Sequence, residues 1–569
     1  MAQEIELLNP VSQPASKGEE AVVSSIDTIE GKTVGIVHSV IPWRGFEEFI
    51  KRVQSLLLKA GVKDVVDLKA RESFHFALPD EETTKRVFDE VAESIDFAIV
   101  GAAFCGSCTT YCAKALVELT KRHIPAVGVT NSHFESLAKA VSRAEGLANV
   151  NWLVLPSNVN TLSGEEFDTL SQEKLQDIQT YLHGKASSAE KRETKGSKPT
   201  SEIIRCKDSI DLIYEQFYKD GLTDGLPIIP PTRERVAAMM STVDSTFDEM
   251  AACLPPRLAN VTLEKLAVNA VMAGCQPSYF PVIVAAVEAM LDPKFNLMGH
   301  QTSTSPTAIM LMINGPIRHE LDINCSWGCF GPGWRANATI GRAISLIMLN
   351  IGGRIPGEIS KSVFANPGRY TMCIGEREEA SPWEPFHVER GFQADQSTVT
   401  VICADGYLGL EAFEETTPDQ LLENLACQLH LPLVLSTYPA WGQGDMLILM
   451  CPDYGRILSE GGYTKQQVQE YFFEHTQDIP SSLIPDWIFQ EMIRRDNDMS
   501  KFYASRSELI KQGLVKPGQR QVTSKGVSAV ARPDQYKIAI AGGDGHINGI
   551  LITSWGRSYM VTRPIKKAT

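Results

Sequence analysis

The sequence has no uninterrupted run of roughly 18 to 20 apolar residues, the length that a membrane-spanning helix needs. Positive charge is in deficit, because 54 Lys and Arg stand against 69 Asp and Glu and the formal net charge is −15. These two features argue against a membrane protein and against a general nucleic-acid binder. The first 25 residues also lack the charged start and apolar core of a secretory signal. We therefore expect a cytoplasmic protein.

The motifs of several large enzyme classes are also missing. No Gly-x-Ser-x-Gly elbow is present to support a hydrolase triad. The glycine turn at 541–545 lacks both the Walker lysine and the full Gly-x-Gly-x-x-Gly pattern, so it does not predict a nucleotide site. No repeat of 20 to 50 residues is visible, which argues against a solenoid. The sequence identifies no resident cofactor.

The chain is long enough for more than one hydrophobic core. It has 569 residues, of which 43% are hydrophobic and 22% charged, as is typical of soluble globular proteins. Segment 183–204 is polar and rich in Lys, Ser and Gly, which predicts a linker. The expected organisation is a flexible arm at 1–30, a first domain at 31–182, the linker at 183–204, and a large second domain at 205–569.

The two domains differ in their patterns of apolar residues. The first alternates short apolar strands with amphipathic helices, which predicts a flavodoxin-like or Rossmann-like parallel sheet with helices on both faces. Its expected strands are 33–40, 64–68, 97–103, 126–130 and 152–156, and its expected helices are 46–59, 81–93 and 109–122. The second predicts a mixed α/β or α+β fold, with helices at 263–273, 281–290 and 338–349 and strands at 398–402, 446–450, 536–541 and 549–552.

Three cysteines, Cys105, Cys108 and Cys112, stand where the third predicted strand ends and a helix begins. Their spacing of three and four residues places them on one helix face. The carboxyl end of a parallel strand is where such sheets bind ligands. The unpaired N–H groups at a helix start favour a thiolate over a thiol. The pattern predicts a reactive cysteine with a neighbour able to resolve it.

Three interpretations of these cysteines remain open. In the first, Cys105 attacks and Cys108 resolves, and an external thiol or a thioredoxin-like reductant reopens the disulfide. In the second, Cys105, Cys108 and Cys112 bind a metal or an iron–sulfur cluster. In the third, they only pack the core. Six further cysteines are expected to be core residues, namely Cys253, Cys275, Cys373, Cys403, Cys427 and Cys451.

Other loops offer weaker candidates for acid–base or binding roles. His133 follows the fourth predicted strand, while Trp43 and Arg44 follow the first and could form a pocket wall and an anion clamp. In the second domain, a loop rich in Gly and Trp contains Cys325, Cys329 and Arg335 and could line a ligand site or exchange disulfides with Cys105. His300 in a hydroxyl-rich loop and His387 between carboxylates are candidate acid–base groups. Each of these residues could equally serve a structural role.

The string Cys105-Gly106-Ser107-Cys108 resembles the motif of the UGSC family, named for selenocysteine-Gly-Ser-Cys. The resemblance implies a cysteine-containing homologue in which Cys105 occupies the position of the nucleophile. The second domain resembles the long segment attached to such domains in hypothetical proteins, at 224–232, 380–392 and 541–545. Segment 119–127 is also similar to the selenocysteine-bearing subunits of glycine and proline reductases, whose selenolate attacks carbon and displaces an amine.

These observations lead to a first hypothesis of a thiol-dependent enzyme, an oxidoreductase acting on a small organic substrate through Cys105 and Cys108. The first alternative is an enzyme that forms or cleaves carbon–sulfur or other carbon–heteroatom bonds by covalent cysteine catalysis. The second alternative is a non-enzymatic metal or redox sensor. The sequence assigns the protein no nucleic-acid or membrane partner.

Overall fold

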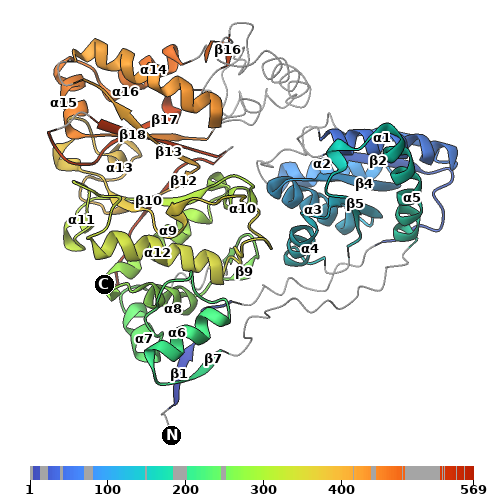
Figure 1. Cartoon of the computed structure of the whole chain (residues 1–569), viewed down its shortest axis with the longest axis horizontal. Helices are drawn as coiled ribbons and strands as arrows, with labels where there is room; N and C mark the ends of the chain where they lie inside the picture. Colours follow the sequence, from blue (N-terminus) through green and yellow to red (C-terminus); the bar gives the residue numbers. More distant parts are fainter. Residues whose placement is uncertain are drawn as a thin grey trace.

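The computed structural model describes residues 4–12, 24–38, 43–68, 81–147, 150–183, 202–244, 252–413, 416–436, 444–476, 479–480, 526–527, 530, 532–545, 548–555 and 558–568. These residues form two α/β units that meet along one side (Figure 1). No helix in the described ranges is long and apolar enough to cross a membrane.

The first unit is a five-stranded parallel sheet with helices on both faces, as the alternating pattern predicts. Its strand order is β3-β2-β4-β5-β6, which is the flavodoxin-like order. The strands are β2 (Thr33–His38), β3 (Asp64–Asp67), β4 (Phe97–Ala103), β5 (Ala126–Asn131) and β6 (Trp152–Leu155). The helices are α1 (Arg44–Lys59), α2 (Glu81–Ser94), α3 (Gly106–Lys121), α4 (Glu135–Ala144) and α5 (Gly164–Leu182).

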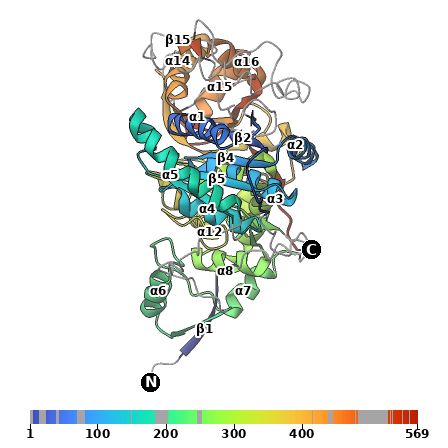
Figure 2. The ribbon, with the colours of Figure 1, turned by 90° about the vertical axis from the view of Figure 1, so that its right-hand side faces the viewer.

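The central strand β4 shows why this sheet forms. All seven of its residues are buried, because α1 and α5 pack on one face of the sheet and α2, α3 and α4 on the other. A strand covered on both faces must be apolar throughout rather than alternating. Figure 2, which looks onto this unit, shows the helices arranged around the sheet.

The second unit contains two four-stranded mixed sheets. The first has the order β11-β10-β12-β19, with β10 (Ala308–Asn314), β11 (Cys373–Gly375), β12 (Thr398–Ala404) and β19 (Val561–Pro564). The second has the order β13-β18-β14-β17, with β13 (Gly406–Glu411), β14 (Met446–Met450), β17 (Tyr536–Ile540) and β18 (Asn548–Thr553). The prediction of a mixed fold for this part of the chain is therefore confirmed.

Four layers build this second unit, with the two sheets packed face to face inside two layers of helices. Side chains of β10 and β12 share a buried cluster with those of β14 and β18, and Met312, Ile402 and Leu449 are among them. The outer face of the first sheet is covered by α8 (Leu263–Ala273), α9 (Phe280–Met290) and α12 (Arg335–Asn350). The outer face of the second is covered by α14 (Pro418–Ser436), α15 (Pro452–Glu460) and α16 (Lys465–His475).

The expectation of a flexible arm at residues 1–30 is wrong for its first part. Strand β1 (Glu4–Leu8) pairs antiparallel with β7 (Ile203–Lys207), so the chain enters the second unit before it forms the first. Leu7 is fully buried there among side chains of α6 (Ile210–Lys219), α7 (Arg233–Met240) and α8. The linker prediction at 183–204 overlaps the start of β7 for the same reason. A two-stranded pairing across about 200 residues leaves no local pattern in the sequence.

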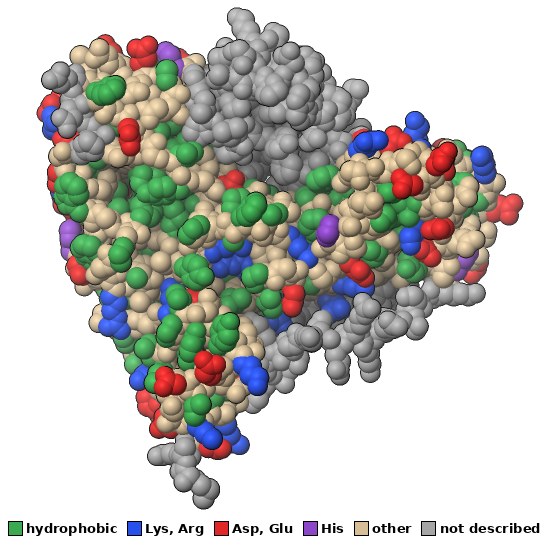
Figure 3. All heavy atoms as spheres, in the orientation of Figure 1, with side chains coloured by type: hydrophobic (Ala, Val, Ile, Leu, Met, Phe, Trp, Pro, Cys, Tyr) green, Lys and Arg blue, Asp and Glu red, His purple; other side chains and the backbone are tan. Residues whose placement is uncertain are grey.

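Short elements complete the second unit, and one of them contacts the first unit. They are β8 (Cys253–Leu254), β9 (Ala259–Asn260), α10 (Leu297–Thr302), α11 (Ile317–Glu320), α13 (Phe386–Glu389), β15 (Ile479–Pro480) and β16 (Gly526–Val527). Helix α10 packs against α3 of the first unit. On the face shown in Figure 3, charged side chains of both signs are scattered over the first unit, and larger apolar groups gather over the second.

Candidate functional site

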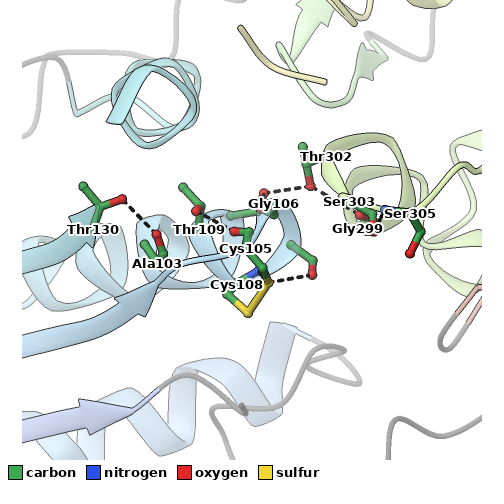
Figure 4. Close-up of a disulfide and its surroundings, with 12 residues drawn as sticks. Ala103, Cys105, Gly106, Cys108, Thr109, Thr130, Gly299, Thr302, Ser303 and Ser305 are labelled. Carbon is green, nitrogen blue, oxygen red and sulfur yellow. Dashed lines mark hydrogen bonds between the residues drawn. A yellow bond between two sulfur atoms is a disulfide. The ribbon is translucent and has the colours of Figure 1, made fainter. Parts of the chain in front are cut away.

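Cys105 and Cys108 are joined by a disulfide at the junction between β4 and α3 (Figure 4). Their Cα atoms are 5.2 Å apart, which is normal for a disulfide. Cys105 is the N-cap residue of α3, and Cys108 lies in the first helical turn. Cys105 is 7% exposed and Cys108 is fully buried. An external thiol would therefore reach the sulfur of Cys105 first.

The start of α3 directs hydrogen-bond donors at the sulfur of Cys105. The backbone N–H of Cys108 donates to Cys105 Sγ at 3.2 Å, as a capping side chain normally accepts. The hydroxyl oxygen of Ser107 lies 3.5 Å from the same sulfur. The hydroxyl of Thr109 donates to the carbonyl oxygen of Cys105 at 2.7 Å and holds the turn in place. Once the disulfide opens, these donors would stabilise a thiolate at Cys105.

The disulfide lies at the point where the strand order of the first sheet reverses. The chain leaves β2 toward α1 on one face and leaves β4 toward α3 on the other. Open sheets bind ligands beyond the carboxyl ends of strands that diverge in this way. Trp43, which precedes α1, packs against both sulfur-bearing residues. Its indole Nε1 is buried and has no partner among the described residues. Arg44, a predicted anion clamp, is exposed at the first turn of α1.

The second unit forms the other wall of this site through α10. A Cβ on Gly106 would lie 1.5 Å from the carbonyl oxygen of Thr302, so the two backbones are in direct contact. The hydroxyl of Thr110 donates to Thr302 Oγ1 at 3.2 Å. Figure 4 shows the end of α10 next to the first turn of α3. The disulfide therefore lies where the two units meet.

Cys112 does not extend the pair into a metal site. It is 3% exposed and belongs to the apolar cluster between α3 and the sheet. Burial raises the pKa of its thiol far above the ordinary value. Across the described ranges, no group of three His, Cys, Asp or Glu residues could hold a metal ion. The geometry places Cys112 in the core rather than beside the disulfide.

The predicted second cysteine pair lies elsewhere, in the loop before α12. Cys325 and Cys329 are free thiols. The carbonyl oxygen of Cys325 accepts from Gly542 N–H at 2.9 Å, and Trp327 covers Gly543, so the loop packs on the glycine turn after β17. Burial raises the pKa of both thiols, that of Cys329 to about 11. The structure does not bring this pair to Cys105.

The remaining predicted site residues are separated from one another. His133 is exposed, and Arg335 is exposed and donates to the carbonyl oxygen of Gly274 at 3.0 Å. His387 is fully buried in α13, with its Nδ1 3.9 Å from Glu378 Oε1, and Figure 1 shows α13 well away from α3. His300, on α10, comes closest to the disulfide helix of these candidates. It is fully buried.

The expectation that six other cysteines are core residues holds for four of them. Cys275, Cys373, Cys403 and Cys451 are buried. It is wrong for Cys427, which lies on the exposed face of α14, and Cys253 is only partly buried. Sequence inspection passed over Arg354 and Arg369, whose charges lie near His300. An arginine after a helix and one in a short turn carry no local signal of such a cluster.

The comparison with protein families agrees with the motif. Residues 6–184 match the model of the UGSC family. This region belongs to the UGSC family. It contains the whole five-stranded sheet and the Cys105–Cys108 disulfide. The crystal structure of Smu.1420 from Streptococcus mutans UA159 is similar at 18% identity, over 26% of this chain and 99% of that chain, with a TM-score of 0.18. No curated protein gives a significant match to this chain.

Proposed function

We propose that this protein is a thiol-dependent oxidoreductase that reduces a small organic substrate with the dithiol of Cys105 and Cys108. The observation that supports it best is the disulfide at the helix start, in which Cys105 is 7% exposed and Cys108 is fully buried. A nucleophile and a resolving thiol need this division of access. A packing role for these cysteines would not need the N–H donor aimed at Cys105.

The chemistry of the cycle balances with two thiols and one external reductant. The Cys105 thiolate attacks one atom of a reducible bond in the substrate, and the other atom leaves with the electron pair and takes up a proton. Cys108 then attacks the sulfur of Cys105, forms the disulfide and releases the first substrate atom, which is protonated in turn. The substrate gains two electrons and two protons, and the dithiol loses them. A thioredoxin-like dithiol outside the protein restores Cys105 and Cys108.

Two residues beside the disulfide fit roles in substrate binding. Trp43 presents an apolar ring against the disulfide, and its Nε1–H, which has no partner among the described residues, is available to donate to a polar substrate atom. The carbonyl end of α10 closes the opposite side at Gly106. The substrate would therefore approach at the carboxyl ends of β2 and β4, where Cys105 keeps its small exposed surface.

An aromatic disulfide, 5,5'-dithiobis(2-nitrobenzoate), tests the cycle, because each released thiolate is counted by its absorbance. The reduced protein with Cys427→Ser serves as the background, since Cys427 is exposed and would react by itself. We expect a fast phase that consumes one reagent molecule, releases two thiolates and leaves the Cys105–Cys108 disulfide. In the Cys427→Ser background, the second substitution Cys108→Ser should stop this phase after one thiolate is released. Peptide mass spectra should then show a reagent adduct on Cys105.

Added Cys105→Ser should abolish the fast phase, whereas Cys112→Ser should leave its stoichiometry unchanged because that thiol is buried in the core. If Cys105 and Cys108 stay reduced while other thiols react, the proposal is wrong. The alternative of an enzyme that acts on carbon–heteroatom bonds predicts a different outcome. It requires an adduct on Cys105 that Cys108 does not release.

A further inference from the structure

Two arginines and a histidine lie together behind α10, the helix that contacts the disulfide helix. Arg354 follows α12 and is 8% exposed, and Arg369 ends a short 3-10 helix at Pro367–Arg369. His300 lies on α10, two residues before Thr302, and is fully buried. Among the described residues, no carboxylate lies within 4.0 Å of either guanidinium. The cluster therefore holds positive charge without a counter-ion from the described chain.

The hydrogen bonds within the cluster determine which atoms remain free. Arg354 Nη1 donates to Gln301 Oε1 at 3.2 Å, and this fixes the orientation of the Gln301 amide because a guanidinium can only donate. Gln301 Nε2 then donates to His300 Nδ1 at 2.8 Å. A neutral imidazole that accepts at Nδ1 carries its proton on Nε2. His300 therefore presents an N–H donor, and Nε2 has no partner among the described residues.

Arg369 adds a second unsatisfied donor. Its Nε donates to the carbonyl oxygen of Thr307 at 2.7 Å, and its Nη1 donates to Ser360 Oγ at 2.8 Å. Its buried Nη2 has no partner in the described part of the chain. The hydroxyl of Thr307 in turn donates to the carbonyl oxygen of His300 at 2.8 Å. Thr307 thus forms hydrogen bonds with both Arg369 and His300.

In their protonation states at neutral pH, Arg354, Arg369 and His300 offer only hydrogen-bond donors at their open positions. Burial, together with the nearby Arg369, lowers the pKa of Arg354 to about 9, which leaves the guanidinium charged at neutral pH. Burial and the two guanidiniums lower the pKa of His300 to about 3, which keeps the ring neutral. Buried donors and buried charge are unfavourable unless they are paired. A group with several acceptor oxygens and a negative charge would satisfy both requirements.

We propose that Arg354, Arg369 and His300 bind a small oxyanion, a carboxylate or a phosphate group, behind α10. A planar guanidinium pair matches either group, and the neutral His300 Nε2–H can donate to a further oxygen. If the anion is part of the substrate, the substrate of the Cys105–Cys108 pair is an anionic organic molecule, and this assignment rests on the proposed function. The anion site itself does not depend on it.

Thermal unfolding in sodium phosphate, sodium acetate and sodium chloride at equal ionic strength tests the site. We expect phosphate or acetate to raise the unfolding temperature of the wild type above its value in chloride, and the more effective salt distinguishes the two sources of the oxyanion. Arg354→Gln and Arg369→Gln should each weaken this effect at least tenfold in apparent affinity. Arg390→Gln is the matched control, because Arg390 is partly buried like Arg369 but lies near the carboxylates of Asp445 and Glu389.

Cys105→Ser separates this proposal from the proposed function. It should retain the full response to phosphate or acetate even if the thiol chemistry proves wrong. The site is refuted if the wild type responds to the oxyanions no more than to chloride, or if both arginine variants respond like the wild type. If the variants fail to fold, crystals of the wild type soaked in sodium selenate test directly whether an oxyanion binds at the site. An anomalous peak within hydrogen-bond distance of Arg354 and Arg369 supports the site, and its absence contradicts it.

Discussion

The two cysteine pairs of this protein have similar spacing but opposite surroundings. Cys105 and Cys108 stand at a helix start, and a backbone N–H donates to the sulfur of Cys105. Cys325 and Cys329 stand in a loop that packs on a glycine turn, and burial raises the pKa of both thiols. Only the first pair is joined in a disulfide. Local backbone geometry, rather than the presence of two nearby cysteines, makes one pair suitable for thiol chemistry.

The two pairs also differ in what holds them in place. The first is in contact with the other unit, because the backbone of Thr302 lies directly against Gly106. The second is enclosed within one unit, by the turn after β17 and the end of β11, where Gly375 lies against Cys325. A change at the first pair therefore tests the junction of the two units, and a change at the second tests only local packing.

Gly106→Ala is expected to have the largest effect. A Cβ there would lie 1.5 Å from the carbonyl oxygen of Thr302, so α10 and α3 must separate. We expect the free energy of unfolding to fall by ~3 kcal/mol or more, as for severe overpacking. Gly331→Ala in the second loop is the control, because its Cβ meets only the carbonyl oxygen of Gly328 at 3.1 Å. Urea unfolding of both variants measures the difference, and equal losses would contradict this account of the junction.

Alkylation of the reduced protein should distinguish the thiols of the two pairs. With a pKa of about 11, the Cys329 thiol is almost entirely protonated at neutral pH, and its reaction rate should rise about tenfold per pH unit between pH 7 and 9. Cys105 should react at least roughly 100-fold faster at pH 7 and depend less on pH, because the helix start favours its thiolate. Iodoacetamide labelling followed by peptide mass spectrometry gives both rates. A similar pH dependence at both sites would show that the helix start does not activate Cys105.

A buried carboxylic acid close to the second pair should make the free energy of unfolding depend on pH. Glu376 follows Gly375, which lies against Cys325, and burial raises the pKa of the Glu376 carboxyl from 4.5 to about 7. The folded state thus holds this proton more tightly than the unfolded state, so stability is greatest below pH 4.5 for this group and falls as pH rises through 7. Glu376→Gln should remove a decline on the order of 2 kcal/mol between pH 5 and 8. Unfolding free energies at both pH values measure it, and an unchanged decline in the variant would assign it to other groups.

The sequence predicts the first unit well because its signals are local. Strand β4 is buried over its whole length, so an apolar run of seven residues marks it, and the amphipathic helices on either side are equally clear. The position of Cys105 at the end of that strand follows from the same pattern. In the second unit, α8 and β14 have the bounds expected from apolar runs, yet the face-to-face packing of the two sheets has no sequence signature.

Long-range contacts account for what the sequence does not reveal. The pairing of β1 with β7 joins residues about 200 positions apart, and Glu4 to Leu8 looks like a flexible arm without its partner. Arg354 and Arg369 resemble ordinary surface arginines in the sequence, and only the loops around α10 bury Arg354 and the Nη2 atom of Arg369. Cys427 looks like a core cysteine, but the face of α14 that contains it points outward.

The sequence by itself determined the dithiol and its setting at a strand end and helix start, because cap geometry depends on a few consecutive residues. Only the tertiary structure decided that Thr302 closes the site, that Trp43 covers the sulfurs, and that the second cysteine pair lies apart. These contacts join residues far apart in the chain, and burial and charge depend on all the elements packed around a group.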